Sequence, residues 1–534
     1  MTRRHLLSTL AAPALSAQAR RPNILLILAD DLGFSDPGCF GGEISTPNLD
    51  RLAANGIRFT QLYNNARCCP SRAAVMTGQH PHKVGMGNMT GNPRREGFPG
   101  YSGRVDENAP FLPAVLKQAG YTTLMCGKWH LGQPGPVARG FDEFYGMIHG
   151  FDSFWDSSKY TRLPAGRPTR NFARFHATDA ITGHALDFIG QARAKPQPWF
   201  LYLAYNAPHF PLHAPKELID KYQPVYEKGW DVLREQRFAR QTKLLGKSAK
   251  LTPRSVVGPN RVSTPNGWAP KQNPAWDTLP EDRRKDLARR MATFAAMVEQ
   301  MDSGIGRILD DLEAKGELQN TLILFCSDNG ACAEWDPYGF DVSSGPTNVL
   351  HTGAKLAGMG QPGTYHSYGS AWANFSNTPW RLYKHYTHEG GISTPCIAHW
   401  PVKIKPGTDH RPWHFIDLLP TLAHVAGAQA PAGIAGENMA AAFERKPTRR
   451  GPIFWEHEGS RAVRDGKWKL TAVYPQGGWE LYDIEADRSE LNNLAAAQPG
   501  RVKKMAAQWE QWARQNQVIP WIWDPAYAPM GSRS

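Results

Sequence analysis

Titratable and amide side chains follow four short apolar runs of the chain. The residues concerned are Asp30, Asp31, Lys128, His130, His209, Asp328 and Asn329. Three carboxylates and one carboxamide offer only oxygen ligands, the set that hard cations such as Ca²⁺ and Mg²⁺ prefer. Clustered carboxylates would repel one another without such a cation. The residue types therefore predict a divalent-cation site with a lysine and two histidines beside it.

The apolar runs themselves are short enough and β-branched or aromatic enough to be buried strands. They are Asn23 to Ala29, Thr122 to Cys126, Trp199 to Tyr205, Thr321 to Cys326 and Cys396 to His399. Helical patterns lie between them, from Thr46 to Gly56, from Leu112 to Gly120 and from about Glu281 to Lys315. Strands that alternate with helices predict an α/β fold with a large, mostly parallel sheet flanked by helices. The carboxyl ends of its strands share one edge, which brings the polar residues together.

Each of these residues has an ordinary structural interpretation when it is taken alone. Asp30-Asp31 after a strand is commonly a turn or a helix cap, and Asp328-Asn329-Gly330 is a good turn sequence. His130 and His209 would commonly be packed or surface residues. The joint pattern at four strand ends favours the metal-site hypothesis over these separate interpretations.

A second pattern is the segment Ala66-Arg67-Cys68-Cys69-Pro70-Ser71-Arg72, which continues to Met76-Thr77-Gly78. Pro70 and the apolar spacing after it predict that Cys68 begins a helix, where free N–H groups and the helix dipole favour anions. Arg72 then lies about one turn further on. A generic Cys-Cys pair would favour a structural or disulfide role, but this longer string is not generic.

Cys-x-Pro-Ser-Arg followed by x-x-x-Met-Thr-Gly is the modification signature of type I sulfatases. The chain resembles these formylglycine-dependent sulfatases of the alkaline phosphatase superfamily, with the bacterial arylsulfatase branch most similar. The resemblance extends over nearly the whole chain after the first residues and keeps the family's motif order. It includes Asp30-Asp31-Leu32-Gly33, Gly127-Lys128-Trp129-His130, Ala207-Pro208-His209, Ser327-Asp328-Asn329-Gly330 and Lys384 ahead of Glu389-Gly390-Gly391.

The resemblance implies a sulfatase that hydrolyses organic sulfate monoesters, either aryl sulfates or sulfated carbohydrates. It implies that Cys68 is oxidised to Cα-formylglycine by a formylglycine-generating maturation enzyme, and that its hydrated diol attacks sulfur. The implied ligands of one Ca²⁺ ion, with Mg²⁺ as the less favoured ion, are Asp30, Asp31, residue 68, Asp328 and Asn329. The implied partners of the reacting sulfate are Arg72, Lys128 and Lys384 as charge-stabilising cations, His209 as general acid, and Asp328 and His130 as bases.

Two alternatives remain open at this point. The first is a phosphonate or phosphate monoester hydrolase of the same superfamily, which shares the fold, although Asp31 and Asn329 favour the sulfatase. The second is a non-catalytic protein that binds a sulfated polymer through its basic excess. Five further histidines could touch a substrate, although packing or surface roles are the more common interpretation: His149, His176, His184, His385 and His388.

The composition excludes several other classes. The chain has 534 residues with 61 Lys and Arg against 48 Asp and Glu, a net charge of +13. The basic residues are scattered without a block of five or more, so no nucleic-acid partner is predicted. No apolar run approaches the roughly 20 residues that span a bilayer, so no membrane span is predicted. The seven cysteines form no C-x-x-C pair, which argues against a zinc ribbon.

The chain divides into three predicted parts. Residues 1–19 carry Arg3 and Arg4, a short apolar stretch and Ala17-Gln18-Ala19, the pattern of an export signal that predicts a periplasmic or secreted protein. Residues 20–436 form the catalytic α/β domain, in which residues 216–280 are a polar insertion with some local helix. Residues 437–534 form a smaller α+β domain with an antiparallel sheet and a helix from about Arg501 to Gln515.

Overall fold

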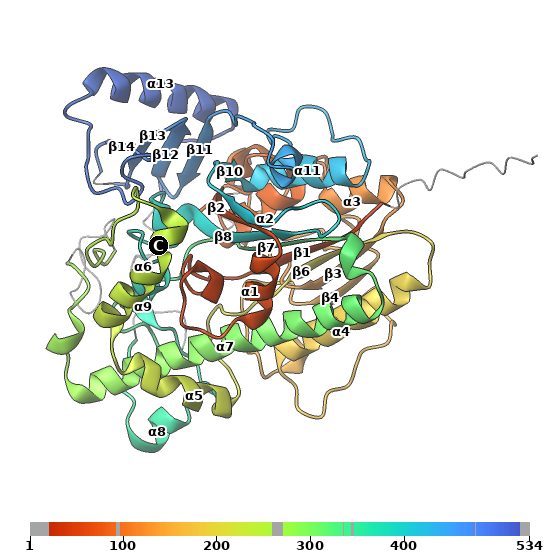
Figure 1. Ribbon diagram of the computed structural model, residues 1–534, viewed down its shortest axis with the longest axis horizontal. Helices are drawn as coiled ribbons and strands as arrows, with labels where there is room; N and C mark the ends of the chain where they lie inside the picture. The colour runs from red at the N-terminus through yellow and green to blue at the C-terminus, as the bar shows by residue number, and fades with distance from the viewer. Residues whose placement is uncertain are drawn as a thin grey trace, which may run out of the picture.

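The computed structural model describes residues 21–523, except 92–94, 96, 259–270, 335, 343–346 and 476. The predicted export signal lies outside these residues. A ten-stranded sheet runs through the larger part of the molecule, in the order β10-β2-β8-β7-β1-β6-β3-β4-β5, with β9 paired to β2 (Figure 1). Its strands are β1 Asn23–Ala29, β2 Ile57–Tyr63, β3 Thr122–Gly127, β4 Glu143–Gly146, β5 Thr161–Leu163, β6 Trp199–Ala204, β7 Thr321–Ser327, β8 Ser393–His399, β9 Gly407–Asp409 and β10 Trp413–His414.

The sheet is mixed, with a parallel centre. Strands β7, β1, β6, β3 and β4 run parallel to one another, whereas β8 is antiparallel to both β7 and β2. Because β8 is antiparallel to both of its neighbours, β2 runs in the same direction as β7 and therefore as β1. Strand β2 was not predicted from the sequence, yet its direction places the segment that follows Tyr63 at the same edge as the residues that follow β1 and β7.

Helices cover both faces of this sheet, and alternate residues of β1 supply the two cores. Leu25 and Ile27 pack with helices α1 Pro47–Ala54, α4 Ala177–Arg193 and α7 Glu281–Ala314. Ile24, Leu26 and Leu28 pack with α2 Cys68–Thr77, α3 Leu112–Gln118 and α11 Leu418–Val425. Figure 1 shows α7 crossing one face of the sheet while α2, α3 and α11 lie on the other. The prediction of a mostly parallel, helix-flanked sheet is confirmed.

The predicted insertion contains more helix than its weak periodicity indicated. It forms α5 Lys216–Tyr226 and α6 Trp230–Leu245, and the shorter helices α8 Gly353–Ala357, α9 Gly369–Ser376, α10 Glu389–Ile392 and α12 Ala440–Phe443 follow further along the chain. Arg237 of α6 explains part of the difference, because it is fully buried and bonds Asp36 and Glu43 near the start of the chain. A buried ion pair of this kind leaves no apolar periodicity to read.

The smaller domain is a four-stranded antiparallel sheet, β11-β12-β13-β14, covered by helix α13 Pro499–Gln515. Its strands are β11 Ile453–His457, β12 Ser460–Asp465, β13 Trp468–Ala472 and β14 Glu480–Asp483. The predicted antiparallel sheet and helix are confirmed, and β12 is the strand the sequence did not indicate. The exact domain limits at residues 436 and 437 stay a prediction.

The two domains meet beside the segment that precedes Cys68. Trp455 of β11 packs with Tyr63 and Ala66, and its indole N–H donates to the carbonyl of Asn64 at 2.8 Å. The smaller domain therefore fixes the chain between β2 and α2. None of the described helices has the length and apolar character needed to cross a membrane.

Candidate active site

The predicted site residues converge at one edge of the large sheet. Asp30 and Asp31 follow β1, Asp328 and Asn329 follow β7, and Lys128 follows β3. The side chains of Asp30, Asp328, Asn329, Lys128 and Arg72 are completely buried. Convergence at the carboxyl ends of the strands confirms the expectation drawn from the order of strands and polar residues.

Tight backbone geometry brings the two aspartate segments into contact. Asp31 adopts a left-handed conformation with φ +66°, and its N–H donates to Asp328 Oδ1 at 3.3 Å. Asn329 Nδ2 donates to Asp31 Oδ1 at 2.7 Å. Gly330 follows because a Cβ there would lie 1.9 Å from the carbonyl oxygen of Gly390. The Asp-Asn-Gly sequence therefore does more than form a turn. It allows the segment after β7 to pack closely against Gly390 and Asp31.

Each of the three carboxylates has a buried cationic partner. Lys128 Nζ lies 2.5 Å from Asp30 Oδ2. Arg72 donates twice to Asp328 Oδ2, at 2.7 and 3.1 Å. Lys384 Nζ lies 2.8 Å from Asp31 Oδ1. Three buried negative charges are therefore matched by three positive ones.

The three carboxyl groups nevertheless differ in acidity. Burial and the nearby charge of Asp30 raise the pKa of Asp328 to about 7, although Arg72 opposes the shift. Burial likewise raises the pKa of Asp30 despite Lys128. Burial would also raise the pKa of Asp31, but Lys384, His209 and Lys128 together bring it below its usual range. Burial is thus the main cause of the raised pKa values of Asp30 and Asp328.

Two side-chain oxygens at this place have no hydrogen-bond partner although they are buried. They are Asn329 Oδ1 and Asp30 Oδ1, of which the latter lies 3.7 Å from Arg72 Nη2. Buried oxygens normally accept a hydrogen bond, and one that does not costs about 1–3 kcal/mol. Ligand atoms of Asp30, Asp31 and His209 also lie within 4.8 Å of one another. A set of oxygen donors, two of them without a hydrogen bond, fits a hard cation.

Cys68 is the first residue of α2, as the sequence predicted, and its side chain is buried. A hydrogen bond from the Cys69 thiol lowers the pKa of Cys68 well below its usual range, and Lys128 and His130 act in the same direction against burial. Burial, together with that same bond, raises the pKa of Cys69. The ligand atoms of Cys68, Cys69 and His130 lie within 4.8 Å of one another. Residue 68 therefore stands in an electropositive environment that stabilises negative charge.

The two histidines have different neighbours, since His130 lies beside Cys68 and Cys69 and His209 beside Asp30 and Asp31. His130 has φ +51°, and burial lowers its pKa to about 4, so its ring is neutral near pH 7. His209 donates from Nδ1 to the carbonyl of Phe210 at 2.6 Å, and its Nε2 lies 3.4 Å from Asp31 Oδ2. Burial lowers the pKa of His209 to about 3. Its ring stacks on Phe151, which is 42% exposed, so His209 lies next to solvent.

A polar cluster that the sequence analysis did not assemble lies next to Cys68. Arg67 Nη1 lies 2.8 Å from His385 Nδ1 and 3.4 Å from Glu334 Oε1. Glu458, from the turn between β11 and β12, lies 3.5 Å from the same ring nitrogen of His385. Only the adjacency of Arg67 to Cys68 and of His385 to Lys384 hinted at this cluster, because the packing of the smaller domain on β2 is not readable from sequence.

The other histidines that the sequence singled out are packed against other groups, except for His149. His176 caps α4 by accepting from the N–H of Thr178, and His184 stacks on Tyr145 at a ring distance of 3.5 Å. His388 contacts Glu480 of the smaller domain at 3.0 Å, and His149 is exposed.

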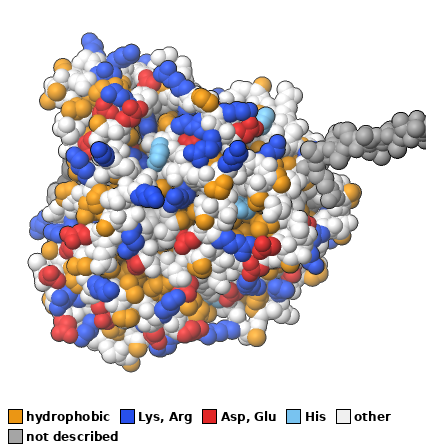
Figure 2. Space-filling view, in the orientation of Figure 1, with side chains coloured by type: hydrophobic (Ala, Val, Ile, Leu, Met, Phe, Trp, Pro, Cys, Tyr) orange, Lys and Arg blue, Asp and Glu red, His pale blue; other side chains and the backbone are white. Residues whose placement is uncertain are grey.

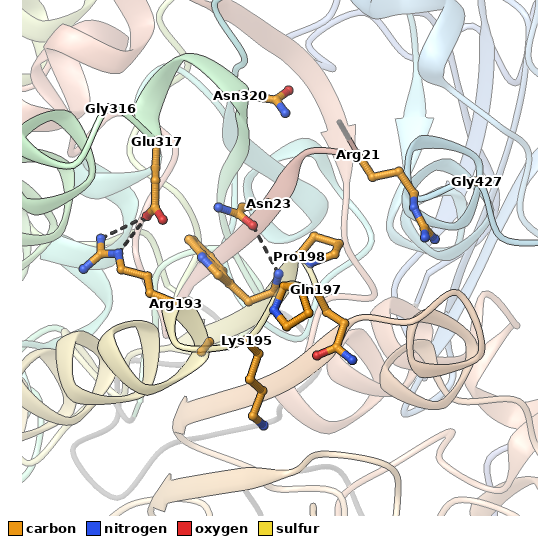
Figure 3. A pocket seen from close by; sticks show the side chains of 13 residues that line it. Arg21, Asn23, Arg193, Lys195, Gln197, Pro198, Gly316, Glu317, Asn320 and Gly427 are labelled. Carbon is orange, nitrogen blue, oxygen red and sulfur yellow. Dashed lines mark hydrogen bonds and ion pairs between the residues drawn. The ribbon is translucent and has the colours of Figure 1, made fainter. Parts of the chain in front are cut away.

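A cavity of about 630 Å³ lies elsewhere, at the amino ends of β1 and β6. Figure 3 shows Asn23 bonded to the backbone at Trp199 and Arg193 paired with Glu317 around it. Ligands of parallel α/β sheets bind beyond the carboxyl ends of strands, so its position argues against a catalytic role.

Comparison with known proteins agrees with this site. The profile of the Sulfatase family matches residues 22–428. The chain belongs to the sulfatase family. A second profile, described as N-sulphoglucosamine sulphohydrolase, C-terminal, matches residues 379–515. This sulfatase is a sulfuric ester hydrolase of the type I sulfatase superfamily.

Similar proteins span nearly the whole of this sulfatase. An uncharacterised sulfatase of Schizosaccharomyces pombe is 34% identical and covers 94% of this chain and 95% of its own. The arylsulfatase of Klebsiella aerogenes is 34% identical over 80% of this chain and 91% of its own. The crystal structure of Ps i-CgsB in complex with k-i-k-neocarrahexaose is 29% identical, with a TM-score of 0.66, and covers 94% of this chain and 95% of its own.

Proposed function

We propose that this sulfatase uses residue 68, converted from Cys to Cα-formylglycine, and one Ca²⁺ ion to hydrolyse sulfated small molecules or glycans. The observation that carries the proposal is the group of buried oxygens around the unpaired Asp30 Oδ1 and Asn329 Oδ1, next to Cys68 at the start of α2. The ligands proposed for the cation are Asp30, Asp31, residue 68, Asp328 and Asn329. A cation there would satisfy both oxygens that lack a hydrogen bond.

The cation would neutralise sulfate oxygens, and the hydrated aldehyde would supply one hydroxyl as the nucleophile toward sulfur and a second whose deprotonation would release sulfate. All other steps belong to side chains of the chain. Arg72, Lys128 and Lys384 form a fixed cationic frame, because each is held by a carboxylate at 2.5 to 2.8 Å. A frame fixed before reaction stabilises charge that develops on the sulfate oxygens.

The histidines divide the proton transfers. His130 is neutral near pH 7 and interacts with Cys68, so it accepts a proton from the group at residue 68. His209 presents Nε2 beside Asp31 and the solvent-exposed Phe151, which suits donation to the leaving alcohol. Burial keeps the pKa of His209 at about 3, so the negative charge of the bound ester must raise that pKa before His209 acts as an acid. Asp328, with its pKa raised to about 7, is the base for the attacking hydroxyl.

The substrate class rests on the relatives. The names of similar enzymes specify aryl sulfates and 6-sulfated amino sugars, and one structural neighbour was solved in complex with k-i-k-neocarrahexaose. A sulfated carbohydrate and an aryl sulfate both remain within the proposal. The N-terminal pattern of residues 1–19 supports export to the periplasm or the medium.

Mass spectrometry of the peptide that contains residue 68 tests the proposal directly. The protein is prepared from its native host or with a co-expressed formylglycine-generating enzyme. Replacement of the thiol by an aldehyde lowers the peptide mass by about 18 Da. The modified fraction should equal the fraction of active sites titrated with substrate, and the metal content should be one Ca²⁺ per chain. Full activity from a preparation with an unmodified thiol would refute the nucleophile.

A further inference from the structure

A cavity lined by cationic side chains lies at the junction of the two domains, away from the residues that surround Cys68. Its volume is about 560 Å³. It is built from the end of α6, strand β2, the segment before β10, residues 448–450, strand β12 and the segment after β14. Its charged and imidazole side chains are Lys243, His410, Arg411, Arg449, Arg450, Arg464, Arg488 and, as the single carboxylate, Glu485.

The cavity contains buried guanidinium groups as well as surface charge. Arg464 is 4% exposed and Arg488 is 3% exposed, and Arg488 is paired with Glu389 at 3.0 Å. Arg464 bonds three neutral groups: the side-chain oxygen of Gln61 and the hydroxyl of Tyr63, each at 2.5 Å, and the carbonyl of Gly466 at 3.2 Å. No described carboxylate lies within ion-pair distance of Arg464, because Glu389 is linked to it only through the Tyr63 hydroxyl, which donates to Glu389 at 3.1 Å. An anion in the cavity would give this buried cation a direct partner.

Two other arginines fix the walls of this cavity. Arg450 is held by both oxygens of Asp417, each at 2.9 Å, and Arg411 is held by Asp409 at 3.0 Å. Their charges are therefore already compensated. The neighbouring Arg449 and Lys243, by contrast, have no ion pair or side-chain hydrogen bond in the described part of the chain. Figure 2 shows Lys and Arg side chains gathered on this face below the smaller domain.

We infer that this junction cavity is a second oxyanion site that binds a sulfate group through Lys243, Arg449 and Arg464. A tetrahedral oxyanion matches the chemistry of several N–H donors that line one cavity in which Glu485 is the single carboxylate. Gln61, in the cavity wall, precedes Cys68 by seven residues, so the two sites are at most about 25 Å apart along the chain. A polysulfated chain of moderate length spans that distance, and free sulfate presents the same group. The site is independent of the roles proposed for the catalytic residues.

The test pairs a cavity variant with a matched surface variant. The double variant Lys243→Ala/Arg449→Ala removes two exposed charges from the cavity, and Lys503→Ala/Lys504→Ala removes two exposed charges from α13. Each protein is titrated calorimetrically with a sulfated neocarrahexaose. In parallel, sodium sulfate is added at constant ionic strength while the thermal unfolding midpoint is followed. Hydrolysis of a small aryl sulfate reports on the active site.

We expect the cavity variant to lose at least about tenfold in apparent affinity, with kcat/KM for the aryl sulfate within twofold of wild type. The α13 variant should match wild type throughout. Loss in both titrations assigns the site to the sulfate group itself, and loss with the hexaose alone assigns it to chain-borne sulfate. Arg464→Gln, checked for folding by its aryl sulfatase activity, should repeat the loss. Equal binding by the cavity variant and the α13 variant in both titrations would overturn the inference.

Discussion

The substitution Arg72→Met tests whether the buried charges of the active site are balanced as the structure indicates. Arg72 is completely buried and makes two N–H bonds to Asp328 Oδ2 and a third to the carbonyl of Lys128 at 2.9 Å. Met fills much of the same volume but offers no donor. Asp328 then remains as a buried carboxylate without its partner, close to the negative charge of Asp30.

Removal of one member of a buried ion pair costs about 3–5 kcal/mol. The cost falls toward the lower end here, because the pKa of Asp328 is already raised to about 7 and the carboxyl group can take up a proton instead. A divalent cation would offset the penalty further. Loss of the Arg72 charge should also tighten calcium binding, and each tenfold gain in affinity adds about 1.4 kcal/mol of stabilisation.

The assay compares thermal unfolding midpoints with EDTA and with excess calcium for wild type, Arg72→Met and Arg290→Met. Arg290 is the matched control, because it is equally buried and pairs with Asp286 at 3.0 Å and Asp341 at 2.8 Å, away from the proposed metal. Both variants should unfold at lower temperature than wild type in EDTA. Calcium should raise the midpoint most in Arg72→Met and equally in the other two. An equal calcium response in all three proteins would show that Arg72 does not share its charge environment with a cation.

Three further predictions follow from other contacts. Asn329→Ala removes the unpaired Oδ1, so calcium affinity, measured by isothermal titration, should fall about a hundredfold, and an unchanged affinity would remove Asn329 from the ligand set. His209→Gln should lower kcat by about 10²–10⁴ for an alkyl sulfate but less than tenfold for 4-nitrophenyl sulfate, whose leaving group needs no acid, and equal losses on the two substrates would contradict the acid role. Burial lowers the pKa of His176 to about 3 from an unfolded value near 6.5, so the unfolded state binds the extra proton and stability is lost as the pH falls below 6.5. His176→Gln should therefore flatten the dependence of unfolding free energy on pH between 6.5 and 4 by about 1.4 kcal/mol per pH unit, as measured by urea unfolding, and an unchanged slope would show that His176 is protonated when folded.

Much of the catalytic layout was predictable because the sheet places strand ends together. The strands before Asp30, Lys128 and Asp328 are apolar on both faces, which makes them recognisable from short uninterrupted runs. Helix α7 was predictable for the related reason that its apolar residues recur every three or four positions up to Gly316.

Strand β2 was missed because Arg58, Thr60 and Gln61 interrupt its apolar run. Two of those polar residues belong to the domain junction: Thr60 accepts a bond from Arg488 through its carbonyl, and Gln61 accepts one from Arg464. The same junction set Arg67, His385 and Glu458 side by side. Contacts between segments several hundred residues apart leave no local pattern, so this part of the site required the three-dimensional structure.

The charge balance of the active site favours the proposed hydrolysis of a sulfate ester. Three carboxylates, on Asp30, Asp31 and Asp328, face three cations, on Arg72, Lys128 and Lys384, so the side chains alone sum to zero. The proposed dication raises the sum to +2. In the proposed route the sulfate group keeps one negative charge as an ester of residue 68 and becomes a dianion only when it is released. The site would attract that dianion more strongly than either monoester, so its cations would lower the barrier to breaking the bond between residue 68 and the sulfate. Removal of any one cation should therefore lower kcat more than it raises KM, whereas a variant that gains affinity for substrate while keeping kcat would contradict this account.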